Sequence, residues 1–150
     1  MKLTLFILAT ALIATILSCG KDKFQTKPLI EIKGYNNKDI VRTPLGNELT
    51  ITLKYFDKEG DMSQAQFFAV RQRLNVRPLP PSNDKADTLR YNLPSFPDET
   101  QGEIVFQLGH QSFLKESPTE NDTLVFRIAV TDRAGNKSDT ITTSKLVIIN

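Results

Sequence analysis

The stretch Leu124-Val125-Phe126-Arg127-Ile128-Ala129-Val130-Thr131-Asp132-Arg133-Ala134-Gly135-Asn136 decides the fold class. Its large apolar residues from Leu124 to Val130 recur at every second position, which is the period of a β-strand with one buried face. The alternation stops at Asp132, and the Asp, Gly and Asn of the next five residues are types that favour tight turns. This pattern therefore predicts a half-buried strand over 123–131 that ends in a turn.

The same alternation recurs along most of the chain after residue 27. It predicts eight strands, at 29–33, 39–42, 48–56, 64–74, 88–93, 103–108, 123–131 and 138–149. Turn-forming residues separate these strands, most clearly between Pro94 and Gly102. Because each half-buried sheet needs a second sheet to cover its apolar face, seven to eight such strands predict an all-β antiparallel β-sandwich.

Two segments resemble the immunoglobulin-like modules of bacterial proteins, a group that includes fibronectin type III and cadherin-like domains. They are Tyr55-Phe56-Asp57-Lys58-Glu59-Gly60-Asp61, and Phe126 to Asn136 with the Ser138-Asp139-Thr140 that follows. The resemblance implies an immunoglobulin-like sandwich in which 132–136 form the turn of the last hairpin. The chain lacks the two cysteines and the core tryptophan of antibody domains. A shared fold also does not by itself imply a function.

The first nineteen residues have the composition of an export signal. Met1-Lys2 precedes an uncharged apolar run from Leu3 to Leu17, which is shorter than the roughly 20 residues that a membrane-spanning helix needs. Ile16-Leu17-Ser18-Cys19-Gly20 then resembles the lipobox of bacterial lipoproteins. The resemblance implies cleavage after Ser18 and diacylglyceryl transfer to the Cys19 sulfur, so that palmitate-type acyl chains anchor the protein in a membrane.

These signals predict a signal peptide at 1–18, a lipidated tether at 19–27 and one immunoglobulin-like β-sandwich domain at 28–150. Removal of the signal leaves about 130 residues, a length at which a single domain buries its own core. Cys19 is the only cysteine, so no disulfide can form within the chain. We expect the protein in the cell envelope, at the periplasmic or the surface face of an outer membrane.

The charge balance argues against a nucleic-acid partner. Nineteen basic and seventeen acidic residues give a net charge of +2, and both signs are scattered along the chain. A nucleic-acid-binding domain instead concentrates its basic residues. The expected partners are the membrane, through the lipid, and an envelope protein or a glycan. The absence of tryptophan weakens the glycan alternative, because sugars stack on aromatic side chains.

Acidic residues in two turns form a candidate calcium site. Alternate carboxylates in a tight turn can converge on Ca²⁺, which takes six or more oxygen ligands. Residues of the second turn, including Asp139, can add oxygens if both turns lie at one end of the sandwich. The candidate ligands are Asp57, Glu59, Asp61, Asp132 and Asn136. The alternative is a solvated hairpin in which an Asp caps the turn and Gly60 supplies a positive φ. No other cofactor is expected.

Three Asp-Thr-aliphatic segments resemble the O-glycosylation acceptor of exported proteins of the Bacteroidota. The resemblance implies glycans on Thr88, Thr123 and Thr140. The alternative is that an Asp in a turn and a β-branched Thr simply begin each strand.

Basic and proline-rich residues suggest a second binding region. Arg71 and Arg73 share one strand face and Arg77 follows, so they form either a small anion-binding patch or a solvated sheet face. Residues 77–87 contain three prolines, which predicts an extended loop that either binds a partner or only connects two strands.

The sequence contains no catalytic constellation that we can identify. His110 is the sole histidine, the only thiol is assigned to lipid, and no nucleophile-elbow pattern surrounds Ser112. We therefore expect a non-catalytic binding, adhesion or assembly-accessory protein. The alternatives are a Ca²⁺-stabilised structural spacer and a small envelope hydrolase, which would need a concave cluster of acids beside a tyrosine or His110.

Overall fold

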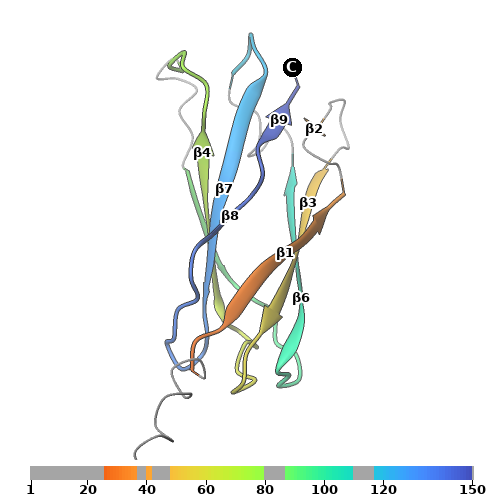
Figure 1. The fold of residues 1–150 in the computed structure, drawn as a ribbon, viewed down its shortest axis with the longest axis vertical. Coiled ribbons are helices and arrows are strands. Elements are labelled where there is room, and N and C mark those ends of the chain that lie inside the picture. Colours follow the sequence, from red (N-terminus) through yellow and green to blue (C-terminus); the bar gives the residue numbers. More distant parts are fainter. Residues whose placement is uncertain (1–25, 37–39, 42–47, 80–86, 110–116, 150) are drawn as a thin grey trace, which may run out of the picture.

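The computed structural model describes residues 26–36, 40–41, 48–79, 87–109 and 117–149. Within these ranges the chain forms strands joined by turns (Figure 1). The strands are β1 (Leu29–Tyr35), β2 (Ile40–Val41), β3 (Glu48–Phe56), β4 (Gln66–Arg73), β5 (Thr88–Asn92), β6 (Gln101–Gly109), β7 (Asp122–Thr131), β8 (Ile141–Thr142) and β9 (Leu146–Ile148). Among the described residues, no helix has the length and apolarity needed to cross a membrane.

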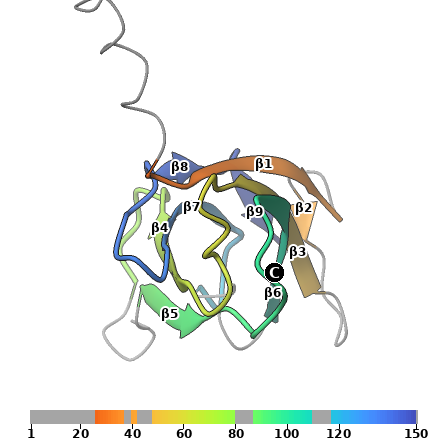
Figure 2. The same cartoon turned by 90° about the horizontal axis from the view of Figure 1, so that it is seen from below.

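The strands form two sheets that face each other. One sheet has the order β1-β3-β6, and the other has the order β2-β9-β7-β4-β5 with β8 paired to β7. The end-on view in Figure 2 shows the first sheet curving around one side of the core, with β4 and β5 on the other side. Every strand pair is antiparallel except β2 with β9. The predicted all-β antiparallel sandwich is therefore confirmed.

The strand order is that of a Greek-key sandwich, the arrangement that an immunoglobulin-like fold would have. β3 pairs with β6 rather than with its chain neighbour β4, which lies in the opposite sheet beside β7. The chain thus crosses between the sheets from β3 to β4, from β5 to β6 and from β6 to β7, as in Greek-key connections.

The last predicted strand is divided in the structure. We predicted one strand over 138–149, but β8 and β9 are separated by residues 143–145. The pairing with β7 shifts by one residue across this gap, from Arg127 opposite Thr142 to Leu124 opposite Leu146. The Thr143 hydroxyl accepts a hydrogen bond from the Phe126 N–H at 2.9 Å. One extra residue thus forms a bulge, which a period-two pattern does not reveal.

The core lies between the sheets and is built from the alternating apolar positions. Leu49, Ile51 and Leu53 on β3 are fully buried, and the core-facing residues of β4, β6 and β7 meet them. Its centre is aromatic: the ring centroids of Phe67 and Phe106 lie 4.9 Å apart. Burial of this apolar surface is the main force that holds the sandwich together.

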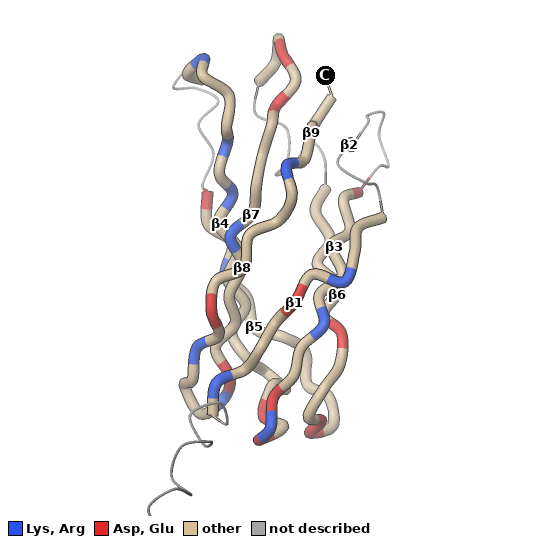
Figure 3. The backbone as a smooth tube through the Cα atoms, in the orientation of Figure 1, with Lys and Arg blue, Asp and Glu red and all other residues tan. Residues whose placement is uncertain are grey.

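The two ends of the sandwich differ in what they carry. The turns 57–65, 93–100 and 132–140 lie at the lower end in Figure 1, where residue 26 leads into β1. We call this the tether end. The opposite end, here the distal end, holds the end of β4, the start of β7 and the end of β9. Figure 3 shows both charge signs along the molecule, with several acidic residues in the turns of the tether end.

Candidate functional site

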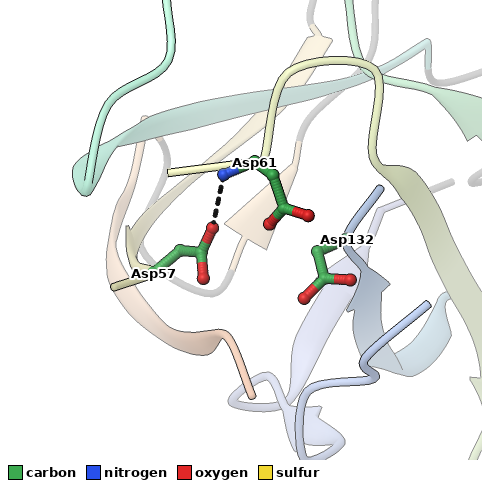
Figure 4. Close-up of side chains that lie close together, drawn as sticks. All are labelled: Asp57, Asp61 and Asp132. Atoms are coloured by element: carbon green, nitrogen blue, oxygen red, sulfur yellow. Dashed lines mark hydrogen bonds between the residues drawn. The ribbon is translucent and has the colours of Figure 1, made fainter. Parts of the chain in front are cut away.

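Two turns at the tether end bring three carboxylates together. Asp57 and Asp61 lie in the connection from β3 to β4, and Asp132 directly follows β7. One oxygen of each residue lies within 4.8 Å of the others (Figure 4). Asp57 and Asp132 are only 2% and 4% exposed, and Asp61 is half-buried. The structure thus assembles three of the five predicted ligands from segments that are about seventy residues apart in the chain.

Asp57 organises the first turn. Its Oδ2 accepts a hydrogen bond from the Asp61 N–H at 2.8 Å, and its carbonyl accepts one from the Gly60 N–H at 3.3 Å. Gly60 has a φ of 73°, a conformation that glycine adopts without steric cost. The capped hairpin that we gave as the alternative is therefore present in its backbone, but its capping carboxylate is buried rather than solvated.

Asn136 organises the second turn. Its backbone N–H donates to Oδ1 of Asp132 at 2.7 Å, and its side-chain amide donates to Oδ2 at 3.0 Å. Asp61 connects the two turns, because its Oδ2 accepts from the Ala134 N–H at 2.9 Å and its carbonyl accepts from the Arg133 N–H at 3.2 Å. Asn136 therefore orients Asp132. These backbone donors had no signal in the sequence, because any residue type supplies an N–H.

The structure does not bring Glu59 or Asp139 to the three carboxylates. Glu59 is exposed at the tip of the first turn. Alternate residues share a side only in an extended strand, and residues 57–60 form a turn. Asp139 is exposed and forms an ion pair with Lys27 at the start of the fold. Sequence reasoning missed this contact of Lys27, because no local pattern links residues 112 positions apart.

Two carboxylate oxygens of the group are buried without a partner. Oδ1 of Asp57 and Oδ1 of Asp61 accept no hydrogen bond from any residue that the structure describes. None of the ion pairs among the described residues includes Asp57, Asp61 or Asp132. Burial raises the pKa of the Asp57 carboxyl, and the neighbouring Asp61 and Asp132 carboxyls raise it further despite the bond from the Asp61 N–H. Among the described residues, the three carboxylates thus have no ion-pair partner.

The arrangement suits holding a cation better than hydrolysis. The two carboxyl groups of a glycosidase stand roughly 5–9.5 Å apart on either side of a sugar. Here the three groups face one another, and backbone or amide donors already occupy both oxygens of Asp132 and one oxygen of Asp61. A cavity of about 600 Å³ beside the group has Asp57 in its wall, together with Lys27, Pro28 and Thr100. This cavity lies on the Asp57 side of the group.

The raised pKa of Asp57 predicts a pH dependence in the absence of divalent cations. A carboxyl whose pKa is raised on folding stabilises the fold fully below its ordinary value of 3.8, and this contribution is lost as the pH rises through the raised pKa. In EDTA, melting curves at several pH values between about 4 and 8 should therefore show Asp57→Asn gaining stability over the wild type as the pH rises.

The exposed Glu59→Gln is the control for this measurement, because it removes an acid at the same end that is not one of the three grouped carboxylates. Parallel pH profiles for Asp57→Asn and the wild type would contradict the prediction.

Arg71 and Arg73 lie on the core-facing side of β4, so the predicted solvated face is wrong. Arg71 is 1% exposed and pairs with Asp87 at 3.2 Å. Arg73 pairs with Asp122 at 2.7 Å and Glu120 at 2.6 Å. Because carboxylates already neutralise both guanidinium groups, the geometry gives little support to an anion patch.

The remaining candidates are only partly described. Thr88 and Thr140 are exposed, whereas Thr123 is half-buried on β7 between two neighbouring strands. Arg77 is exposed, and its carbonyl accepts a hydrogen bond from Arg73 at 2.5 Å. Outside the described residues lie Cys19, His110, Ser112 and most of the 77–87 loop.

No family model matches the chain, and a search of curated proteins finds no significant match. Beyond the confirmed fold class, membership of a family of bacterial lipoproteins or immunoglobulin-like modules stays a prediction.

Proposed function

We propose that this chain is a lipid-anchored, non-catalytic module of the cell envelope that works by contact with a partner. The observation that carries the proposal is the polarity of the fold: the chain enters at the tether end, and β9 finishes at the distal end (Figure 1). The nine residues from Gly20 to Pro28 span at most about 30 Å. An anchor at Cys19 therefore holds the tether end near the membrane and leaves the distal end free for a partner.

The distal end has a rigid base, which supports this assignment. The Asn75 side chain donates to the Asn121 carbonyl at 2.9 Å and accepts from the Thr123 N–H at 2.8 Å. Arg73 adds its bonds to Asp122 and Glu120 below them. Two chain segments, 74–79 and 117–121, are thus fixed to each other. Binding residues of sandwich proteins tend to lie on loops that such a scaffold positions.

An exposed apolar residue at the distal end also favours contact with a partner. Val76 is fully exposed and lies beside Arg77 and Pro78. A single exposed apolar side chain is ordinary on a protein surface. Its position beyond the rigid base, however, makes 74–79 the first region to mutate in a search for the partner.

Metabolic labelling tests the anchor. Cells of a diderm bacterium that express the full chain are fed an alkyne analogue of palmitate, and the protein is isolated and probed for label. We expect the wild type to carry label and to lose residues 1–18. We expect Cys19→Ala to carry no label and to keep them. Each buried CH₂ contributes roughly 0.8 kcal/mol, so the labelled form should remain entirely with membranes. An unlabelled wild type, or a labelled Cys19→Ala, would contradict the proposed anchor.

Protease treatment of intact cells tests the location of the partner. Digestion of the domain on intact cells would place the distal end at the surface and favour adhesion or capture of a ligand. Protection until the outer membrane is opened would favour an accessory function in a periplasmic assembly, with the partner found by crosslinking from the exposed segment 74–79. A catalytic rate that the purified chain supports on an envelope substrate would overturn the non-catalytic assignment.

A further inference from the structure

We propose that Asp57, Asp61 and Asp132 bind one divalent cation of the calcium type at the tether end of the sandwich. This inference does not depend on the lipid anchor or on a binding partner. It rests on the distances among the three carboxylates, on two buried oxygens, and on the way in which the two turns are held.

The distances fit a single ion. Calcium binds oxygen at 2.3–2.6 Å, so two ligands of one ion lie at most about 5 Å apart. The three carboxylate oxygens lie within 4.8 Å of one another. One ion can therefore contact all three side chains, whose arrangement is drawn in Figure 4.

The buried oxygens need a positive partner. Asp57 is only 2% exposed, and its Oδ1 accepts no hydrogen bond from the described part of the chain. Oδ1 of Asp61 is in the same condition. A buried carboxylate without a partner is costly, and buried charges in proteins are paired or coordinate metals. No lysine or arginine among the described residues pairs with these carboxylates. A cation from solution would therefore neutralise them.

The turns hold the ligands in place before an ion arrives. Asn136 donates to both oxygens of Asp132, and the Ala134 N–H holds Oδ2 of Asp61. The two oxygens without a partner are the remaining ones, on Asp57 and Asp61. Ligands whose orientation is already fixed lose little conformational entropy on binding.

The type of ligand set favours calcium over magnesium. Calcium accepts six to eight oxygens in a flexible geometry, and water or backbone carbonyls supply those that carboxylates do not. Magnesium demands near-ideal octahedral geometry and gives up water reluctantly. Three carboxylates from two irregular turns, beside a cavity of about 600 Å³ that admits water, suit the less demanding ion.

A bound ion would join the two sheets. Asp57 follows β3 of the three-stranded sheet, whereas Asp132 follows β7 of the other sheet. The ion would thus connect the sheets at the end where the tether begins, close to the ion pair of Lys27 with Asp139. We therefore expect calcium to act chiefly on the stability of the sandwich.

Thermal unfolding tests the site. The full chain is purified in a non-ionic detergent, stripped with EDTA, and melted under circular dichroism in increasing CaCl₂ or MgCl₂. We expect a saturable rise in Tm with calcium, on the order of 10 °C at a hundred times Kd, and a smaller rise with magnesium at the same concentration. Equilibrium dialysis with radioactive calcium should find one ion per chain.

Two pairs of variants identify the ligands. Asp61→Asn and Asp132→Asn should abolish the rise in Tm and the bound calcium. Glu59→Gln and Asp98→Asn, which remove exposed acids at the same end, should retain both. In EDTA, Asp61→Asn should melt no lower than the wild type, because asparagine keeps an oxygen for the Ala134 N–H and removes a repulsive charge.

Dialysis that finds no calcium on the wild type overturns the proposal, whatever the variants do. Calcium that stays bound in Asp61→Asn and Asp132→Asn places the ion elsewhere and overturns it too. If an Asn variant fails to fold, loss of binding in Asp57→Asn with retention in Glu59→Gln supports the site, and retention in both overturns it.

Discussion

Arg73→Met should lower the free energy of unfolding by about 3–5 kcal/mol, because it leaves a buried carboxylate without the cation beside it. The Asp122 side chain is completely buried, and Nε of Arg73 donates to its Oδ1 at 2.7 Å. Burial alone would lower the pKa of Arg73. The hydrogen bonds and charges of Asp122 and Glu120 outweigh this effect and raise the pKa. Methionine fills a similar volume without a charge, so the loss reports on the ion pair rather than on a cavity.

Urea denaturation followed by circular dichroism measures this loss. Glu120→Gln is the matched control: it removes the second acid, whose side chain is 29% exposed, and should cost under about 1 kcal/mol. The double variant Arg73→Met/Asp122→Asn should recover part of the loss, because it removes the buried charge as well. A loss for Arg73→Met no greater than that for Glu120→Gln would show that the buried pair contributes little.

This ion pair also explains why one of the sequence expectations failed. Alternation along β4 correctly places Arg71 and Arg73 on one face, but charged residues on a strand ordinarily face solvent. The structure turns that face inward, and Asp87 and Asp122 make burial possible. Both acids come from other parts of the chain, and Asp122 lies 49 residues beyond Arg73. Single-sequence periodicity carries no information about partners at such a separation.

The strands themselves were predictable because their signal is local. β3 spans Glu48–Phe56, the predicted bounds, and its burial alternates at every residue. The divided strand at 138–149 was not predictable, because a bulge changes the pairing without changing the composition. Periodicity thus gives the face that a residue occupies, whereas pairing irregularities depend on the neighbouring strand.

The acidic group was likewise predictable only in part. Residue types in turns pointed to Asp57, Asp61 and Asp132, since Asp and Gly mark turns and carboxylates attract cations. They also pointed to Glu59 and Asn136, which the structure places differently. The direction of a side chain in a turn depends on individual φ and ψ angles, such as the 73° of Gly60, and these angles follow from the folded context.

The buried charged groups lie at the two ends of the long axis of the molecule. The tether end holds the acidic group that a cation would neutralise, and the distal end holds carboxylates that arginines already neutralise. The apolar core lies between them. Because Cys19 is the only cysteine, no disulfide within the chain reinforces this core. Changes at the centre of the sandwich should therefore have large effects.

Phe106→Ala should lower the free energy of unfolding by about 3–5 kcal/mol, a large part of the roughly 5–15 kcal/mol that stabilises a typical domain. Phe106 is 1% exposed on β6, with ring centroids 4.9 Å from Phe67 and 6.0 Å from Phe126. Removal of the ring loses its burial and leaves a cavity that rigid neighbouring strands fill poorly. Urea denaturation measures the effect, and the exposed neighbour Val105→Ala serves as the control.

The same variant separates the core from the proposed ion site. Phe106 lies opposite Ile51 on β3, six residues before Asp57 and hence about 20 Å from it along the strand. Effects of sites so far apart usually add. Calcium should therefore stabilise Phe106→Ala by the same free energy as the wild type. The urea midpoint of the variant should be lower than that of the wild type both with and without calcium, because the core defect is present in both conditions. A calcium effect that disappears in Phe106→Ala would mean that the ion acts through the packing of the core rather than by joining two preformed turns.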